Sequence, residues 1–463
     1  MAENKNPMEL LAERDKIFYD FYHNVTPERM PVISALQNPA VAGYCGQDLM
    51  EWHYNSSVLF PAYEKLLEKL YSDVCPFMPP VLIARPATPY QILGSQSFVL
   101  AANGLVQHPD VVGKVAEEYP ELIEKGFDFL VEKVIPRQYK NMGFDDPAKM
   151  AYTMQLQINE RNNEMQAYMP QYIGMCMKMG YHNGGTLGTG GFAEAPFDFL
   201  ADQLRSFSQI SVDVRRRRSE VAEAVEALTP IMWKMGRPPF IDYQANVFYP
   251  LHMPTFMREK DVRELYMPTF KRLMEQDAAH GVRPWIFIED DWTRYLDLIY
   301  DEFPAGCVLR IDEGDPQAFK DKLGKKFILE GMFPFEYMRT CDTPKLLDKA
   351  KEFLDIMLPG CGYLFTFNKG PLVASDMDFD KYCDLTNFVR DYSHWANAGE
   401  PFGTPLNSEG YQIDPEIDKP LKSRLLFNWD EYKAANPYAP EASRAKLEAA
   451  NAQAFSWYIN LLA

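Results

Sequence analysis

The chain has 463 residues, of which 47% are hydrophobic, 14% aromatic and 24% charged, the composition of an ordinary globular protein with a sizeable core. Its formal net charge of −18 argues against nucleic acid as a partner, because phosphate contacts need a basic surface. The first residues, MAENKNPMELLAERDK, carry charges where a signal peptide needs its apolar run, and no stretch approaches about 18 apolar residues, so we expect a cytoplasmic protein without a membrane span.

The first 150 residues are predicted to be mostly helical. The stretches 61–71 (PAYEKLLEKLY) and 108–135 place apolar residues three and four positions apart, with charges between them. The short run PVIS at 31–34 is the candidate for a first strand. We expect the segment from about 105 to 180 to be a helical insertion in a larger domain.

A glycine-rich segment, HNGGTLGTGG, follows at 182–191. It is too flexible for a helix, and it lacks the lysine and serine or threonine that end a phosphate-binding P-loop. We interpret it either as a mobile lid over a substrate or as a plain connecting loop. His182, which opens the segment, is a candidate substrate-binding residue.

After about residue 235, strand-like apolar runs alternate with helix-like stretches. The predicted strands are 240–249, 284–288, 307–311, 326–332 and 362–367, and the predicted helices are 258–279, 293–302, 315–323, 343–357 and 378–396. This alternation is typical of βα units on a parallel sheet. About three more strands fit into residues 30–235 and no GxGxxG fingerprint follows a strand, which favours a (β/α)8 TIM barrel over an open sheet.

The whole chain is therefore predicted to form one α/β domain, a barrel with a helical N-terminal region and a C-terminal extension at about 400–463. The last part of that extension, 440–462 (PEASRAKLEAANAQAFSWYINLL), reads as helical and ends in an apolar stripe. The stripe could pack on its own subunit or on another, and a homodimer is the second of these options.

Polar residues stand where the predicted late strands end. They are Tyr249, His252, Glu289, Asp290, Asp291, Asp312, Glu313, Glu330, Asn368 and Lys369. Active residues of a barrel gather at this end of the strands. The alternative is that these acids cap the following helices, and for Asp291, just before a helical stretch, we expect a cap.

Glu289 is the strongest candidate for chemistry. Strand alternation puts it on the same face as Phe287 and Trp285. If that face is the barrel interior, desolvation would raise its pKa and suit it to general-acid work, whereas an acid paired with a neighbouring Arg or Lys is the plainer alternative.

His252 is the one histidine at the end of a predicted late strand, and we expect it beside Glu289. Such a pair could also contribute to a zinc site, because nitrogen and oxygen ligands suit Zn²⁺. No HExxH or HxC spacing supports this ligand set, so zinc is an alternative role for Glu289 and His252.

Residues 190–396 resemble the uroporphyrinogen decarboxylase superfamily. The resemblance rests on the block GGFAEAPFDFLADQLRSFSQISVDVRRRRSEVAEAVEAL and on the order of the later segments LHMPTFMREKDVRELYMPTFKRLMEQDAAHGVRPWIFIEDDW, LGKKFILEGMFP and TPKLLDKAKEFLDIMLPGCGYLF. It implies a (β/α)8 barrel that is either a porphyrinogen decarboxylase or a corrinoid-dependent methyltransferase.

Two departures from the superfamily narrow this choice. The decarboxylases carry a block of the type PVWxMRQAGR, whereas this chain reads RMPVISALQNPAVAGYCG at 29–46, without those arginines. The methyltransferases that activate coenzyme M bind zinc through HxC and a distant Cys, whereas here the corresponding strand reads FIEDD. The resemblance then implies the methyltransferase-like branch without its thiol-activating zinc chemistry.

The function hypothesis is a corrinoid-dependent methyltransferase that moves a methyl group from a small donor, such as an aryl methyl ether or a methylamine, to a corrinoid on a partner protein. Glu289 and His252 would be catalytic. The substrate-binding candidates are Asp290, Asp312, Glu330, Asn368, Tyr249, Phe192 and His182. Decarboxylation of another substrate and a non-catalytic ligand-binding barrel are the alternatives.

Overall fold

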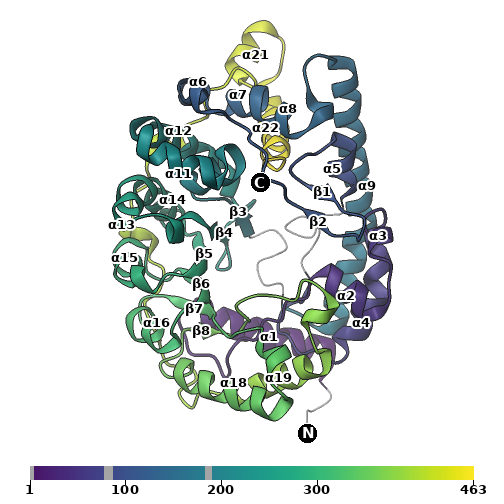
Figure 1. Cartoon of the computed structure of the whole chain (residues 1–463), viewed down its shortest axis with the longest axis vertical. Coiled ribbons are helices and arrows are strands. Elements are labelled where there is room, and N and C mark those ends of the chain that lie inside the picture. The colour runs from purple at the N-terminus through teal and green to yellow at the C-terminus, as the bar shows by residue number, and fades with distance from the viewer. Residues whose placement is uncertain (1–4, 78–86, 183–189, 463) are drawn as a thin grey trace.

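The computed structural model describes residues 5–77, 87–182 and 190–462. Six strands form one parallel sheet in sequence order: β3 Gly190–Phe192, β4 Asn246–Leu251, β5 Arg283–Asp291, β6 Val308–Glu313, β7 Ile328–Gly331 and β8 Tyr363–Leu364. The strands follow one another along an arc with helices on its outer side (Figure 1). The predicted α/β architecture is confirmed at this level.

The helices of the second half match their predicted places. Each strand from β4 onward is followed by helix before the next strand begins, as βα units require. These helices are α13 Glu259–Asp261, α14 Met267–Ala279, α15 Leu296–Glu302, α16 Pro316–Leu323, α17 Tyr337–Thr340, α18 Thr343–Met357 and α19 Phe379–Tyr392.

Strand β4 starts later than the sequence predicts. Residues 240–245 form a turn, in which the side chain and carbonyl of Asp242 accept hydrogen bonds from the backbone N–H groups of Gln244 and Ala245. An Asp that bonds the backbone two residues on favours a turn over a strand. The strand therefore begins at Asn246.

Isolated bridges carry the sheet beyond β8. Val32, in the predicted first strand, pairs in parallel with Phe365, and the Asp73 N–H donates to the Val32 carbonyl at 2.8 Å. Val74 then pairs in parallel with His182. The link from His182 to β3 runs through 183–189, so closure of the barrel, and the predicted lid, lie outside the described residues.

The N-terminal region is helical apart from the short hairpin of β1 Val99–Leu100 and β2 Val106–Gln107. The predicted helix 108–135 is shorter than expected: it starts at Tyr119, where Pro120 occupies the first turn, a position that suits proline. The helices are α1 Pro7–Tyr22, α2 Asn38–Cys45, α3 Leu49–Trp52, α4 Phe60–Leu67, α5 Thr88–Leu93, α6 Tyr119–Lys125, α7 Phe127–Phe129, α8 Ile135–Gln138 and α9 Pro147–Met179.

Three helices connect β3 with β4, and three more lie in the C-terminal extension. The first set is α10 Pro196–Phe199, α11 Phe207–Arg216 and α12 Arg218–Gly236, and the second is α20 Pro415–Asp418, α21 Trp429–Ala435 and α22 Arg444–Ile459. Among the helices of the described residues, none is long and apolar enough to cross a membrane.

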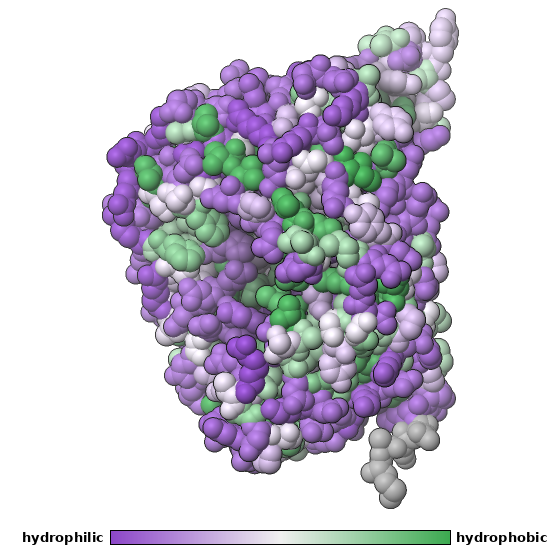
Figure 2. Space-filling view, turned by 45° about the vertical axis from the view of Figure 1, so that its right-hand side comes forward, coloured by the Kyte–Doolittle hydropathy of each residue, from purple (hydrophilic) through white to green (hydrophobic). Residues whose placement is uncertain are grey.

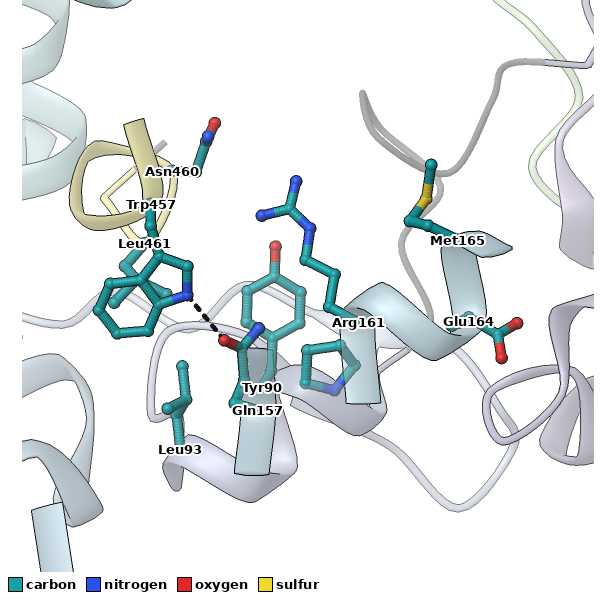
Figure 3. A pocket seen from close by; sticks show the side chains of 10 residues that line it. Tyr90, Leu93, Gln157, Arg161, Glu164, Met165, Trp457, Asn460 and Leu461 are labelled. Carbon is teal, nitrogen blue, oxygen red and sulfur yellow. Dashed lines mark hydrogen bonds between the residues drawn. The ribbon is translucent and has the colours of Figure 1, made fainter. Parts of the chain in front are cut away.

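The apolar stripe of the tail packs on its own chain. Ile459 and Leu462 are each 1% exposed, and the Tyr139 hydroxyl donates to the Leu461 carbonyl at 2.5 Å. The Trp457 indole reaches α9 and donates to Gln157 at 2.8 Å (Figure 3). Of the two options from the sequence, the structure shows the intramolecular one.

Candidate functional site

A cavity of about 720 Å³ lies at the carboxyl ends of the strands, where the barrel hypothesis expects the site. Strands β3 to β6 and the segments around 35–38 and 368–376 line it. Its wall combines phenylalanines with titratable side chains, which makes it the candidate site. On the outside, Figure 2 shows a largely hydrophilic face with scattered apolar patches, some of them beside a hollow near the middle of the view.

His252 and Glu289 meet in this cavity, as the sequence predicts. The His252 Nδ1 lies 2.8 Å from Glu289 Oε2, and both residues line the cavity. The Glu289 side chain is 37% exposed, so it is not the desolvated acid that we expected. Phe287 shares its cavity-facing side, which confirms the strand alternation.

A bulge ends strand β5. Ile288 pairs with Ile311 and Asp291 with Glu313, so β5 holds one residue more than β6 between the two pairs. Asp290 is the extra residue of the bulge. Its φ of +64° lies in the left-handed region, which Asp tolerates better than most residues. Asp291 then accepts a hydrogen bond from the Thr293 N–H at 2.8 Å, a turn contact just before the short helix Thr293–Tyr295. The N-cap of that helix is Trp292, without a side-chain hydrogen bond, so the expected cap by Asp291 is wrong.

Asp198, on α10, fixes the end of β4. Its carboxylate accepts hydrogen bonds from the backbone N–H groups of His252 and Met253, at 3.3 and 2.9 Å, and from the Tyr266 hydroxyl at 2.5 Å. Burial raises the pKa of Asp198 to about 6, although His252 and these donors oppose the shift. These contacts fix the backbone at His252 and so hold this residue in place.

Glu194 is the buried acid of the cavity, and sequence reasoning missed it. It follows β3 and is 2% exposed. Gln203 donates to its Oε1 at 3.0 Å, and its Oε2 has no hydrogen-bond partner among the described residues. Burial, with the nearby charge of Asp202, raises the pKa of Glu194 to about 8, so this carboxyl is protonated at neutral pH.

A signal for this acid was present in the sequence. Glu194, Asp198 and Asp202 recur every fourth residue directly after a strand, a spacing that puts side chains on one face of a helix. Burial raises the pKa of Asp202 as well. Acids at that spacing after a strand end indicate a cluster beside the site.

His252 balances these acids. Burial alone would lower its pKa, but the hydrogen bond to Glu289 and the charges of Asp198, Glu289 and Glu194 together raise it to about 10. The imidazole is therefore a cation at neutral pH. A half-buried cation, His252, and a buried carboxyl, Glu194, consequently face the same cavity.

Three phenylalanine rings from successive strands form one wall. Phe192 and Phe248 are stacked with centroids 6.3 Å apart, and Phe248 is stacked with Phe287 at 6.3 Å. Tyr249, which we expected in this wall, points to the helices instead, where its hydroxyl donates to Asp277 at 2.7 Å. Tyr249 and His252 are three residues apart, and alternation cannot bring both to one face.

The remaining candidates at the β6 and β8 ends form a polar network. The Asp290 N–H and the Asn368 amide donate to Asp312, at 3.3 and 3.4 Å. The Lys369 ammonium lies 3.2 Å from Asp312 and 3.4 Å from Glu313. Asn368 lines the cavity, whereas Asp312 supports the network behind it.

Glu330 lies below the cavity, inside the sheet arc. It is 1% exposed, and the Trp285 indole donates to its Oε2 at 2.7 Å. Arg310, which sequence reasoning did not single out, approaches Glu330 at 4.0 Å and lines the cavity floor. Glu330 thus contacts the site through Arg310.

His182 lies away from this cavity. Its two ring nitrogens contact Asp15 and Gln244, at 2.7 and 2.9 Å, and its ring stacks on Phe18. Gln244 precedes β4, so His182 sits at the amino ends of the strands. The predicted substrate-binding residue is therefore separated from the site, which lies at the opposite, carboxyl ends of the strands.

The donor set does not fit zinc. No group of three or more His, Cys, Asp or Glu side chains within 5–77, 87–182 and 190–462 is arranged to hold a metal ion. Structural and catalytic zinc sites need at least three protein ligands. Glu289 and His252 are better explained as a hydrogen-bonded pair.

Comparison with known proteins shows a similarity in fold only. No family model and no curated protein matches the sequence. Among solved structures, the chain is similar to a methyltransferase from Methanosarcina mazei, with 14% identity and a TM-score of 0.50 over 82% of this chain and 98% of that one. At this identity the likeness concerns the fold alone, and the resemblance to the uroporphyrinogen decarboxylase superfamily stays a prediction.

Proposed function

We propose that this protein is a corrinoid-dependent methyltransferase built on a (β/α)8 barrel. It would take a methyl group from a small methylated donor, such as an aryl methyl ether, bound in the cavity. The observation that carries the proposal is the placement of Glu194, a buried carboxyl with one oxygen unpartnered among the described residues, in the wall of the cavity that His252 also lines. Burial raises the pKa of Glu194 to about 8, which favours its protonated form at neutral pH. The fold of the methyltransferase described above supports the same class of reaction.

Cleavage of a methyl ether needs a proton source, because a phenolate is a poor leaving group. When the bond from methyl carbon to oxygen breaks, the bonding pair stays on oxygen, and the Glu194 proton is placed to neutralise it. The resulting carboxylate is stabilised by the cation of His252, which Glu289 and Asp198 hold in place. General-acid catalysis of this kind contributes about 10² to 10⁴-fold.

Positioning of the reactants supplies a larger share of the rate enhancement than the general acid. The rings of Phe192, Phe248 and Phe287 offer a flat apolar surface on which an aromatic donor can be held. Fixing two reactants in register is worth roughly 7 to 11 kcal/mol.

A corrinoid on a partner protein supplies the nucleophile that accepts the methyl group. Exposed apolar side chains near the cavity offer such a group a surface: Phe207 and Phe256 are exposed with ring centroids 6.3 Å apart, the Phe207 ring lies 6.4 Å from that of His252, and the exposed Leu372 lines the cavity. A flat macrocycle can cover apolar surface of this kind.

Methyl transfer to free cob(I)alamin tests the proposal. The absorption change on methylation is followed with a panel of methoxyarenes and methylamines, using wild type and Glu194→Gln. We expect transfer from at least one methoxyarene and its loss in the variant. Absence of methylcobalamin with every donor, with free and with protein-bound corrinoid, would sink the proposal.

Decarboxylation is the second candidate, and Arg310 favours it, because a cation in the cavity can hold a substrate carboxylate. The same incubations without corrinoid, assayed for CO₂, separate the two reactions. Release of CO₂ without methyl transfer would replace the first candidate by the second.

A further inference from the structure

Arg310 differs from the other cations around the cavity in how little it is bonded. Its guanidinium lies over the Phe287 ring, 5.1 Å from the centroid, and its closest carboxylate oxygen, on Glu330, is 4.0 Å away. Its Nε is buried and has no hydrogen-bond acceptor in the part of the chain that the structure describes. A buried donor without an acceptor is costly, so this group is arranged for an acceptor from outside.

The neighbouring cations are already paired or exposed. Lys369 contacts both Asp312 and Glu313, and its side chain is 59% exposed. Arg339 lies 3.9 Å from Asp376 and its side chain is 64% exposed, whereas that of Arg310 is 19% exposed. Arg310 is therefore the cation of this wall with most to gain from an anionic ligand.

Glu330 does not complete the coordination of Arg310. Its Oε2 already accepts from the Trp285 indole, and burial raises its pKa, which weakens it as a counter-ion. The planar fork of a guanidinium matches the two oxygens of a carboxylate, and such paired bonds are stronger than neutral ones. A ligand carboxylate fits this position.

Strand register sets the distance from Arg310 to the acidic side. Arg310 pairs with Phe287, Phe287 pairs with Pro250, and His252 stands just beyond Pro250. Two strand spacings separate β6 from β4, roughly 10 Å. The rings of Phe248 and Phe287 lie on the surface between them, so one aromatic ring with polar groups at both ends can span the gap.

We propose that the methyl donor is a single-ring aryl methyl ether that carries a carboxylate. Arg310 binds the carboxylate, Phe248 and Phe287 hold the ring, and the ether oxygen lies beside Glu194 and His252. This inference rests on the proposed function for the reaction, but the carboxylate contact can be tested by binding alone.

The test compares each isomer of methoxybenzoate with the neutral methoxybenzamide of the same shape. Binding is measured by calorimetry, and methyl transfer to cob(I)alamin by absorption, for wild type, Arg310→Gln and Arg310→Lys. Arg263→Gln, an exposed arginine paired with Glu259 on the outer helices, is the matched control. Arg310→Lys keeps the charge near Glu330 and serves if Arg310→Gln does not fold.

Wild type and the Arg263→Gln control are expected to prefer one benzoate over its benzamide by about 10 to 100-fold, the value of hydrogen bonds to a charged group. Arg310→Gln should abolish that preference, and Arg310→Lys should retain part of it. An equal loss for both ligands in Arg310→Gln would show a structural role and overturn the inference, as would a wild type without preference. If the benzoate binds through Arg310 but no donor yields methyl transfer, the carboxylate site stands and the proposed function fails.

Discussion

Two buried carboxyls lie on opposite sides of strand β4. Glu194 and Asp277 are 2% and 1% exposed, and burial raises the pKa of each to about 8. Glu194 borders the cavity, and one of its oxygens has no hydrogen-bond partner in the described part of the chain, whereas Asp277, on α14, accepts a hydrogen bond from Tyr249 inside the packed layer between strands and helices. The same shift in pKa therefore arises at a candidate site and in a core.

The difference between them lies in access. A raised pKa marks a group that holds its proton, but only a group that can reach a ligand can deliver that proton. Glu194 also faces His252, whose pKa is raised to about 10 and which as a cation at neutral pH can stabilise the Glu194 charge once the proton has left. Asp277 is bonded to the Tyr249 hydroxyl and does not line the cavity of the candidate site, which suits a structural role.

The largest expected effect comes from Glu194→Gln, which keeps the shape of the side chain and removes its acidity. Methyl transfer from an ether should fall by about 10² to 10⁴-fold, the usual contribution of a general acid. Single-turnover rates with cob(I)alamin measure it. Wild-type activity should decline as pH rises through about 8, when Glu194 loses its proton, and the variant should lack that decline.

Glu223→Gln, on the exposed side of α12, is the control and should leave the rate unchanged. If Glu194→Gln transferred methyl groups from unactivated ethers at the wild-type rate, Glu194 would not be the general acid. Its role would then not differ from that of Asp277.

The next effect concerns stability, in Asp277→Asn. The folded protein keeps a proton on Asp277 up to about pH 8, whereas the unfolded chain releases it near the ordinary Asp value, so wild-type stability falls as pH rises between those points. The amide of the variant does not titrate. The free energy of unfolding of the variant should therefore rise relative to that of wild type by about 1.4 kcal/mol for each pH unit in that interval.

Urea unfolding at several pH values measures this gain, with methyl transfer unchanged. Glu194→Gln should flatten the pH dependence of stability in the same direction, yet lose activity. Equal activity losses in both acid variants would contradict the distinction between them.

Tyr249→Phe should have a smaller effect. Removal of the hydroxyl leaves the buried Asp277 carboxyl without its donor, at a cost of about 1 to 3 kcal/mol in the free energy of unfolding. The adjacent Phe248→Leu should instead weaken donor binding, because Phe248 belongs to the cavity wall. Thermal unfolding and KM are measured for both variants. Tyr249→Phe should lower the stability and leave KM unchanged, whereas Phe248→Leu should raise KM. A higher KM for Tyr249→Phe would contradict this prediction.

The smallest effect is expected for Glu289→Gln. Its side chain is 37% exposed, and partly exposed charge pairs are worth at most about 1 kcal/mol, so the rate should fall less than about 10-fold. The pKa of His252, raised to about 10 with Glu289 as a main cause, should drop in an NMR titration. An unchanged titration would show that Asp198 and Glu194 suffice.

Much of the second half of the fold was predictable from periodicity. The helices at 316–323 and 343–357 and the strands β5 to β7 lie where alternation and apolar spacing put them. Local pattern also found the pair of His252 and Glu289, because both stand at ends of adjacent strands. The position of Tyr249 could have been corrected from strand parity alone.

What escaped prediction depends on tertiary contacts. Glu194 follows a strand of only three residues, too short to show alternation, and it is covered in the fold, where Gln203, nine residues further along the chain, donates to it. Arg310 lies inside an apolar run, where its direction depends on which face of β6 lines the cavity. Neither burial nor direction can be derived from neighbours in sequence.

The bulge at the end of β5 has a consequence for how such a site can change over time. Because Asp290 is the extra residue, the side on which Glu289 and Asp291 lie depends on the number of residues there as well as on their identity. Losing one codon at this position would restore regular pairing and move the Asp291 carboxylate away from the Thr293 N–H, to the other side of the strand. A single deletion could thus remodel the acidic side of the cavity while every remaining residue stays the same.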